Sequence, residues 1–149
     1  MEQTVGDDAQ APNEYANNER LSNESPWLDN LLGEAISKRT SDIHIEPGKA
    51  SAQMRLRVDG LLYKLDTYDM EVHPQIVSHI KVLSKMDIAN VHFPQDGQFE
   101  HVFEERTHYV RVSTFPTIYG EAVVMRILNR ADAVLSLDQL GFAEKQLKD

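Results

Sequence analysis

The strongest constraint on the fold of this chain is an alternation of apolar and polar side chains with a period of two. It runs through 41–46 and resumes at 52–58, after which the Asp59-Gly60 dipeptide leads into a further strand at 61–65. Such alternation gives a strand one apolar and one polar face. An Asp-Gly pair between two alternating runs favours a tight hairpin. The sequence therefore predicts three consecutive antiparallel strands.

Two other segments have the spacing of helices. Apolar residues recur on one helical face from Ser25-Pro26 to Ile36, and again from Pro74 to about Asp87. Ser25 can accept hydrogen bonds from the opening amides, and proline suits the first turn of a helix. One helix is thus predicted before the three strands and another after them.

A second group of strands follows the second helix. Asp96-Gly97 predicts a turn, after which 98–103, 109–115 and 121–128 are rich in Val, Phe, Tyr and Thr. The resulting order, αβββαβββ, predicts an α+β fold with antiparallel sheets packed against helices. A PAS-like arrangement is one form that this order can take.

Charge and composition exclude several classes of protein. Residues 1–24 contain six acidic residues and only one basic residue, Arg20, which predicts a disordered arm or linker. The net charge of −9 argues against non-specific binding of nucleic acid, and we expect no nucleic-acid partner. The absence of cysteine excludes thiolate metal sites and fits a cytoplasmic location. No apolar run has the roughly 18 residues of a membrane-spanning helix.

The common enzyme motifs are missing from the sequence. Gly48-Lys49 is followed by Ala50, and the position five residues before Gly48 is Ile43, so there is no Walker A loop. Nucleophile elbows, zinc-binding His-Glu-x-x-His helices and dinucleotide-binding glycine motifs are absent as well. We therefore expect no catalytic residue in this segment.

Histidines suggest a metal site only weakly. His101 and His108 flank a hairpin predicted around 104–107, which would place them diagonally on one sheet face. Diagonal neighbours are marginal ligands, and no third ligand stands at a defined spacing. We expect surface or partly packed histidines and no metal.

Arg55 and Arg57 lie on the polar face of the second predicted strand. They could form cross-strand ion pairs with the acidic residues of the first strand, and exposed pairs of this kind contribute only about 0–1 kcal/mol each. The other interpretation is a role in subunit contact or in steering phosphate.

Arg111 and Arg126 are the most informative pair. If the last two strands close symmetrically with Thr117 opposite Gly120, the two arginines face each other. Like charges in that position are unfavourable unless an anion or acidic neighbours compensate. The sharper hypothesis is a bound anion; the alternatives are local carboxylates such as Glu121, or a register slip of one residue.

Four motifs carry a resemblance to a known family. They are SDIHIEP at 41–47, MRLRVDG at 54–60, FPQDG at 93–97 and RVSTFPTIYGEAVVMRIL at 111–128. In this order and spacing, they resemble the domain that precedes the motor core in type II secretion and type IV pilus assembly ATPases. The resemblance covers about 25–141.

The resemblance implies a nucleotide-gating and inter-subunit role. Residues 25–135 would be the N-terminal domain next to a C-terminal RecA-like core, and 136–149 would be a linker toward that core, which the chain lacks. The family implies hexamers in which ATP and Mg²⁺ bind in the full-length protein, with the arginines at Arg111 and Arg126 reaching toward the phosphates. No cofactor is expected to bind tightly to this segment alone.

Partners and departures also follow from the resemblance. The implied partners are the ATPase core, neighbouring subunits and the inner-membrane platform or other secretion machinery, which gives a cytoplasmic location peripheral to the inner membrane. Family members usually carry arginine near the positions of His92 and Gln98, so contacts there are expected to differ. The alternative function is a stand-alone interaction or sensor domain with no nucleotide role.

We predict that the chain by itself releases no phosphate from ATP above background. Phosphoryl transfer needs a phosphate-cradling loop, a metal ion and a positioned water, and the sequence lacks the motifs that provide them. A phosphate-release assay on the purified chain checks this. Turnover that disappears when Arg111 or Arg126 is replaced would contradict the prediction.

Overall fold

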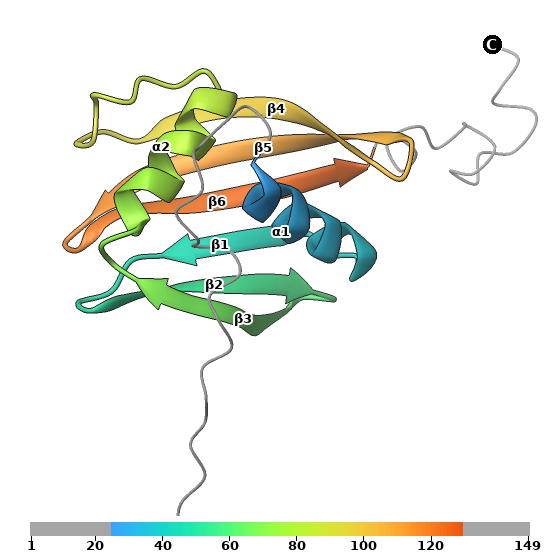
Figure 1. Ribbon diagram of the computed structural model, residues 1–149, viewed down its shortest axis with the longest axis horizontal. Helices are drawn as coiled ribbons and strands as arrows, with labels where there is room; N and C mark the ends of the chain where they lie inside the picture. Colours follow the sequence, from blue (N-terminus) through green and yellow to red (C-terminus); the bar gives the residue numbers. More distant parts are fainter. Residues whose placement is uncertain (1–24, 130–149) are drawn as a thin grey trace, which may run out of the picture.

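The computed structural model of the protein describes residues 25–129, which form one antiparallel sheet with two helices on the same face (Figure 1). The strand order across the sheet is β3-β2-β1-β6-β5-β4. The elements are α1 (Pro26–Ser37), β1 (Asp42–Glu46), β2 (Ser51–Val58), β3 (Leu61–Asp69), α2 (His73–Leu83), β4 (Gln95–Phe103), β5 (Arg106–Thr117) and β6 (Gly120–Asn129).

The predicted α+β class and the order αβββαβββ are confirmed. The two groups of three strands do not form separate sheets, because β1 pairs with β6 at the centre. Ile43 lies opposite Met125 and Ile45 opposite Val123 in this pairing. The first and last strands of the described part of the chain are therefore neighbours.

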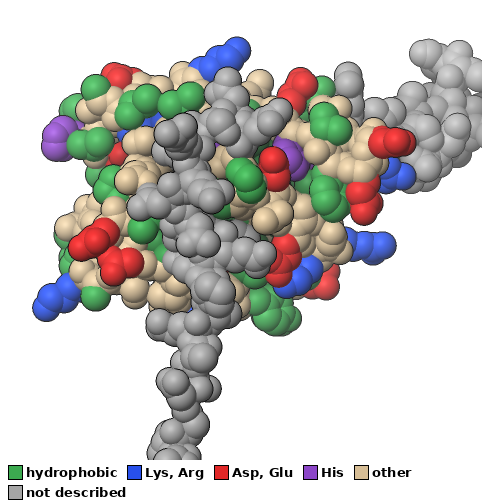
Figure 2. Space-filling model, in the orientation of Figure 1, with side chains coloured by type: hydrophobic (Ala, Val, Ile, Leu, Met, Phe, Trp, Pro, Cys, Tyr) green, Lys and Arg blue, Asp and Glu red, His purple; other side chains and the backbone are tan. Residues whose placement is uncertain are grey.

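The hydrophobic core lies between the helices and the sheet. Ile43 and Ile45 of β1 face the helices and are fully buried, and Leu31 and Leu32 of α1 are buried with them. On the opposite face of β1, Asp42, His44 and Glu46 are polar, as the alternation requires. Figure 2 shows the helix-covered side, where acidic and basic side chains mix along the rim. The open face of the sheet is thus left for polar side chains.

Both helices end in a Schellman motif. The residues after the last turns, Arg39 and Lys85, have left-handed backbone angles with φ of 55° and 57°. The amides of Thr40 and Met86 then bond carbonyls five residues earlier. The prediction that the second helix reaches Asp87 is wrong, because the left-handed residue ends α2 at Leu83.

The two Asp-Gly pairs have different roles. Asp59 and Gly60 have φ of 51° and 79° and form the predicted tight turn between β2 and β3. Asp96-Gly97, predicted as a turn, lies instead inside β4. A Cβ at Gly97 would lie 2.4 Å from the carbonyl oxygen of Ser84. Glycine is required there because the strand passes close to the end of α2.

A buried ion pair joins α2 to the start of β6. Lys81 is 1% exposed, and its Nζ lies 2.8 Å and 2.7 Å from the two carboxylate oxygens of Glu121. The same Nζ donates to the carbonyl of Asn90 at 2.8 Å. A charge buried this deeply is stable only with such partners.

His73 extends this polar cluster toward β3. Its Nε2 donates to the carbonyl of Glu121 at 2.6 Å, and its Nδ1 accepts from the hydroxyl of Tyr68 at 2.6 Å. Because a carbonyl can only accept, the proton of neutral His73 resides on Nε2. Burial lowers the pKa of His73, although the carbonyl and the charge of Glu121 raise it.

Several expectations fall outside the described residues. They concern the arm at 1–24, the end of the folded domain beyond 129, and the linker at 136–149. Within 25–129, neither helix is long and apolar enough to cross a membrane.

We predict that Lys81→Met lowers the free energy of unfolding by about 3–5 kcal/mol, because it leaves Glu121 charged and buried without its partner. Adding Glu121→Gln should recover part of the loss. Urea unfolding measures both variants. Lys38→Met is the control, since Lys38 is half exposed and pairs with Glu34 within α1; it should cost no more than about 1 kcal/mol. Equal losses for the two lysines would contradict the prediction.

A second prediction concerns pH. The unfolded chain takes up a proton at His73 near the usual pKa of about 6.5, whereas the folded chain does so only at lower pH. The contribution of His73 to the free energy of unfolding should therefore be complete above about pH 6.5 and decrease as the pH falls below it. An NMR titration of the His73 ring, with urea unfolding at several pH values, checks this. Protonation of folded His73 at or above pH 6.5 would show it wrong.

Candidate anion site on the open sheet face

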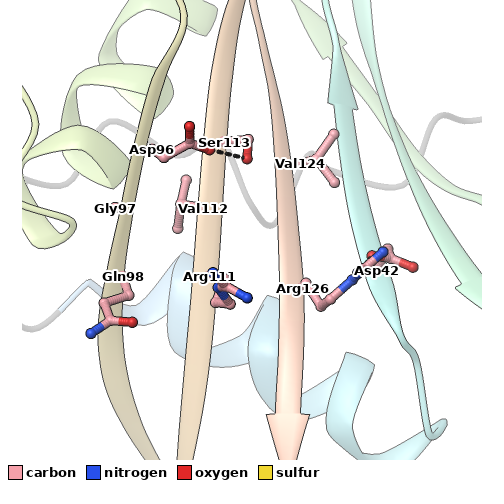
Figure 3. Close-up of a pocket in the computed structure, with 9 residues that line it drawn as sticks. All are labelled: Asp42, Asp96, Gly97, Gln98, Arg111, Val112, Ser113, Val124 and Arg126. Atoms are coloured by element: carbon pink, nitrogen blue, oxygen red, sulfur yellow. Dashed lines mark hydrogen bonds and ion pairs between the residues drawn. The ribbon is translucent and has the colours of Figure 1, made fainter.

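A row of polar side chains crosses the open face of the sheet. In register, Gln98 of β4 lies opposite Arg111 of β5, Arg111 opposite Arg126 of β6, and Arg126 opposite Asp42 of β1. Arg57 of β2 lies on the other side of Asp42. Figure 3 shows Gln98, Arg111, Arg126 and Asp42 at one level, with the helices behind the sheet. Five adjacent strands thus contribute one side chain each.

Arg111 and Arg126 face each other as the sequence predicts. The register from Thr117 opposite Gly120 continues without a slip to the two arginines. The alternative of neutralising carboxylates holds in part, because Asp42 pairs with Arg126. The side chain of Glu121, in contrast, lies on the helix-covered face and binds Lys81. Two guanidiniums therefore share one side of the sheet.

Only Arg126 of this pair has a carboxylate partner among residues 25–129. Its Nε donates to Oδ1 of Asp42 at 2.9 Å, and the Arg126 side chain is 64% exposed against 9% for Asp42. Arg111 is exposed and makes no ion pair within the described part of the chain. The two arginines differ in how firmly they are held.

The Asp42 carboxylate is held on both oxygens. The hydroxyl of Ser41 donates to Oδ2 at 2.9 Å, and Nε of Arg57 lies 4.0 Å from the same oxygen. Burial alone would raise the pKa of Asp42, but the hydrogen bonds from Arg126 and Ser41, with the charge of Arg126, bring it below the usual value. Asp42 is therefore ionised at neutral pH.

A hollow of about 650 Å³ lies over this part of the sheet. Besides the row, Asp96 and Ser113 line it, and the Ser113 hydroxyl donates to Oδ1 of Asp96 at 2.6 Å (Figure 3). We call this hollow the anion pocket; it is lined by Asp42, Asp96, Gly97, Gln98, Arg111, Val112, Ser113, Val124 and Arg126.

The two arginines of the anion pocket suit a phosphate group, and the carboxylates of Asp42 and Asp96 line the pocket beside them. Guanidiniums present donors in a planar fork that matches phosphate oxygens, and the pocket holds two of them. The neighbouring His44 adds no charge, because burial lowers its pKa more than Asp42 raises it. Arg111 makes no ion pair within 25–129, and it is the group whose charge a bound anion would compensate.

The other predicted arginines form ion pairs on the same face. Arg55 contacts Glu46 through Nη2 at 2.5 Å, which confirms the predicted cross-strand pairing. Arg57 lies near Asp42 and donates from Nη1 to the carbonyl of Gly60 at 2.9 Å. Their role in subunit contact or phosphate steering stays a prediction.

The two departures from the family pattern lie in different places. Gln98 lines the anion pocket beside Arg111. His92 is exposed in the segment before β4, where its amide bonds the side chain of Asn90. Only Gln98 can therefore alter the pocket directly.

His101 and His108 lie directly opposite each other, so the predicted diagonal placement is wrong. The hairpin turns at Glu104 and Glu105, which both have left-handed angles, and this sets the register. Nδ1 of His101 lies 3.7 Å from a carboxylate oxygen of Asp29. Among the residues that the structure describes, no group of three or more His, Cys, Asp or Glu could hold a metal ion.

Sequence reasoning missed the partner of Arg126. The alternation places Asp42 on the polar face of β1, but only the pairing of β1 with β6 brings it to Arg126. The buried pair of Lys81 and Glu121 was missed too. The sequence does contain a signal for the burial of Lys81. This charged residue lies four residues after Val77, on the apolar face of α2 that packs into the core.

The chain belongs to the family described as "Type II/IV secretion system protein", whose sequence model matches residues 18–149. It is 37% identical over 132 residues to the type IV pilus assembly ATPase PilB of Acinetobacter baylyi, covering 86% of this chain and 23% of that protein. It is 42% identical over 114 residues to the type II secretion system protein E of Aeromonas hydrophila, covering 76% and 23%. The chain thus spans about a quarter of the length of these relatives.

A solved structure has a similar fold. The crystal structure titled as the pilus retraction motor PilT with bound ADP matches 81% of this chain and 34% of that one, with a TM-score of 0.55. The sequence identity is 20%, so the likeness concerns the fold alone.

Proposed function

We propose that this chain is the nucleotide-gating and inter-subunit domain of a hexameric secretion or pilus-assembly motor, in which Arg111 and Arg126 contact the phosphates of ATP. The observation that carries the proposal is a pair of arginines opposite each other on adjacent strands in an open pocket, with a carboxylate, Asp42, bonded to Arg126. Membership of a family whose relatives include a pilus assembly ATPase supports it.

The residues of the anion pocket can contact the phosphates of a nucleotide, but they do not form a complete nucleotide-binding site. Two arginines can neutralise phosphate charge, but the sequence has no Walker loop, and the described part of the chain has no metal-ligand cluster. ATP and Mg²⁺ would therefore be held by a RecA-like core, where they supply the phosphoryl group and its charge neutralisation. The role of this chain is to bring Arg111 and Arg126 to the phosphates and to move when the phosphates leave.

Contact with the core and with neighbouring subunits is supported by apolar side chains at one end of the sheet. Ile118 and Tyr119 at the tip of the β5–β6 hairpin are 90% and 47% exposed, and Phe93 just before β4 is 68% exposed. Gln95 pairs with Thr114, which places Phe93 at the same end as the hairpin tip. Exposed apolar groups that gather in this way are typical of interaction surfaces.

This function places the protein in the cytoplasm, where it would reach the inner membrane through platform or other machinery proteins. The competing function is a stand-alone interaction or sensor domain that uses the same apolar end. The two differ in whether the arginines matter for ATP turnover.

We predict that Arg111→Ala and Arg126→Ala each lower the ATP turnover of the assembled motor containing this chain by about tenfold or more, since arginines that contact transferring phosphates contribute at least that much. The thermal midpoint should stay level or rise for Arg111→Ala, because a like charge is removed from the hairpin. ATPase assays and thermal unfolding measure the two effects.

Arg55→Ala is the matched control. Arg55 lies on the same face but is paired with Glu46 outside the anion pocket, so its loss should leave turnover within about twofold because an exposed ion pair contributes little. Full turnover in the Arg111 and Arg126 variants would favour the interaction domain. Equal failure of Arg55→Ala with unchanged stability would extend the site to β2.

A further inference from the structure

The two arginines of the anion pocket are not equivalent. Nε of Arg126 is bonded to Asp42, whereas Arg111 has no carboxylate partner among residues 25–129. An exposed arginine has many rotamers of similar energy, and ordering it costs side-chain entropy. Any ligand of this pocket therefore meets one arginine that is already oriented and one that it must order itself.

Asp42 is well placed to orient Arg126. The side chain is 9% exposed, and β1 is paired on both sides, with β6 and with β2, so the backbone below it is fixed. Both carboxylate oxygens have partners, Arg126 on one and Ser41 on the other. A carboxylate fixed in this way is a rigid acceptor.

The bond uses the one guanidinium nitrogen that a phosphate does not need. Arginine has five N–H groups, one on Nε and four on the two terminal nitrogens. With Nε turned to Asp42, the terminal nitrogens of Arg126 make no hydrogen bond within the described part of the chain. They remain available to a ligand in the anion pocket, which Arg126 lines together with Arg111.

We propose that Asp42 is the positioning residue of the anion pocket, which holds Arg126 by Nε so that its terminal nitrogens face the bound phosphates. The effect on ATP turnover rests on the function proposed above; the orientation of Arg126 does not. The carboxylate also offsets one positive charge in a row that contains Arg57, Arg111 and Arg126. Asp42 therefore has two opposite effects. It orients Arg126 toward a bound phosphate, and its negative charge weakens the attraction of the pocket for anions.

Two substitutions separate these effects. Asp42→Asn removes the charge but keeps an oxygen that can accept from Nε of Arg126, and the hydroxyl of Ser41 can then accept from the new amide. Asp42→Ala removes both the charge and the acceptor. Glu46→Gln and Glu46→Ala are the matched controls, because Glu46 lies on the same strand and face and pairs with Arg55 outside the pocket.

The first measurement follows the Nε–H group of Arg126 by ¹⁵N NMR in the 149-residue chain, with Arg126→Lys to assign its signal. We expect exchange of this proton with water to be about tenfold faster in Asp42→Ala than in the unsubstituted chain, and close to unchanged in Asp42→Asn and both Glu46 variants. Thermal unfolding verifies that each variant is folded. Equal exchange in Asp42→Ala and the unsubstituted chain overturns the proposal, and so does fast exchange in Asp42→Asn, if that variant is folded.

The second measurement is the split between kcat and KM in the assembled motor containing this chain. We expect Asp42→Ala to lower kcat by about tenfold with KM for ATP unchanged or reduced, and Asp42→Asn to restore kcat to within about threefold. Equal losses of kcat in the two variants overturn the positioning role in turnover. If Arg126 exchange behaves as expected but neither the Asp42 nor the Arg126 variants alter turnover, Asp42 still orients Arg126 and the nucleotide function is what fails.

Discussion

The pairing of β1 with β6 is the interaction on which the rest of this domain depends. It joins the first and last strands in sequence of residues 25–129 at the centre of the sheet, and the bonded side chains Asp42 and Arg126 are 84 residues apart in the sequence. On the helix-covered face, this pairing sets Ile43 and Ile45 beside Met125 and Val123 in the core. On the open face, it places a carboxylate beside one of two facing arginines. The same backbone hydrogen bonds therefore build the core and the candidate site.

Interactions on the helix-covered face also shape the rim of the anion pocket. Lys81 binds the carbonyl of Asn90, and the side-chain amide of Gln95 donates to the carbonyls of Asp87 and Asn90. These bonds fix the segment between α2 and β4, while Gly97 lets β4 pass close to Ser84. Asp96 and Gln98 enter the pocket from this strand. A buried lysine that does not touch the pocket thus helps to set its edge.

The sequence was sufficient where the physical cause is local. Alternation with a period of two, the apolar helical stripes and the turn at Asp59-Gly60 all depend on neighbours within a few residues, and the structure confirms them. The facing of Arg111 and Arg126 was predictable for the same reason, because a hairpin register follows from its turn. The end of α2 and the role of Gly97 were not, since both depend on how α2 meets β4. Asp42 could not be linked to Arg126 without knowing which strand lies next to β1.

The central position of β6 has a consequence for the order in which the chain is made. The strands β1, β2 and β3 are synthesised first, but the inner edge of β1 has no partner until the residues of β6 have emerged about 80 positions later. Until then, an unpaired strand edge lies beside an apolar face, a combination that favours association between chains. Contacts between distant segments form slowly because a long loop must close first. The first three strands therefore depend on β6 for protection as well as for stability.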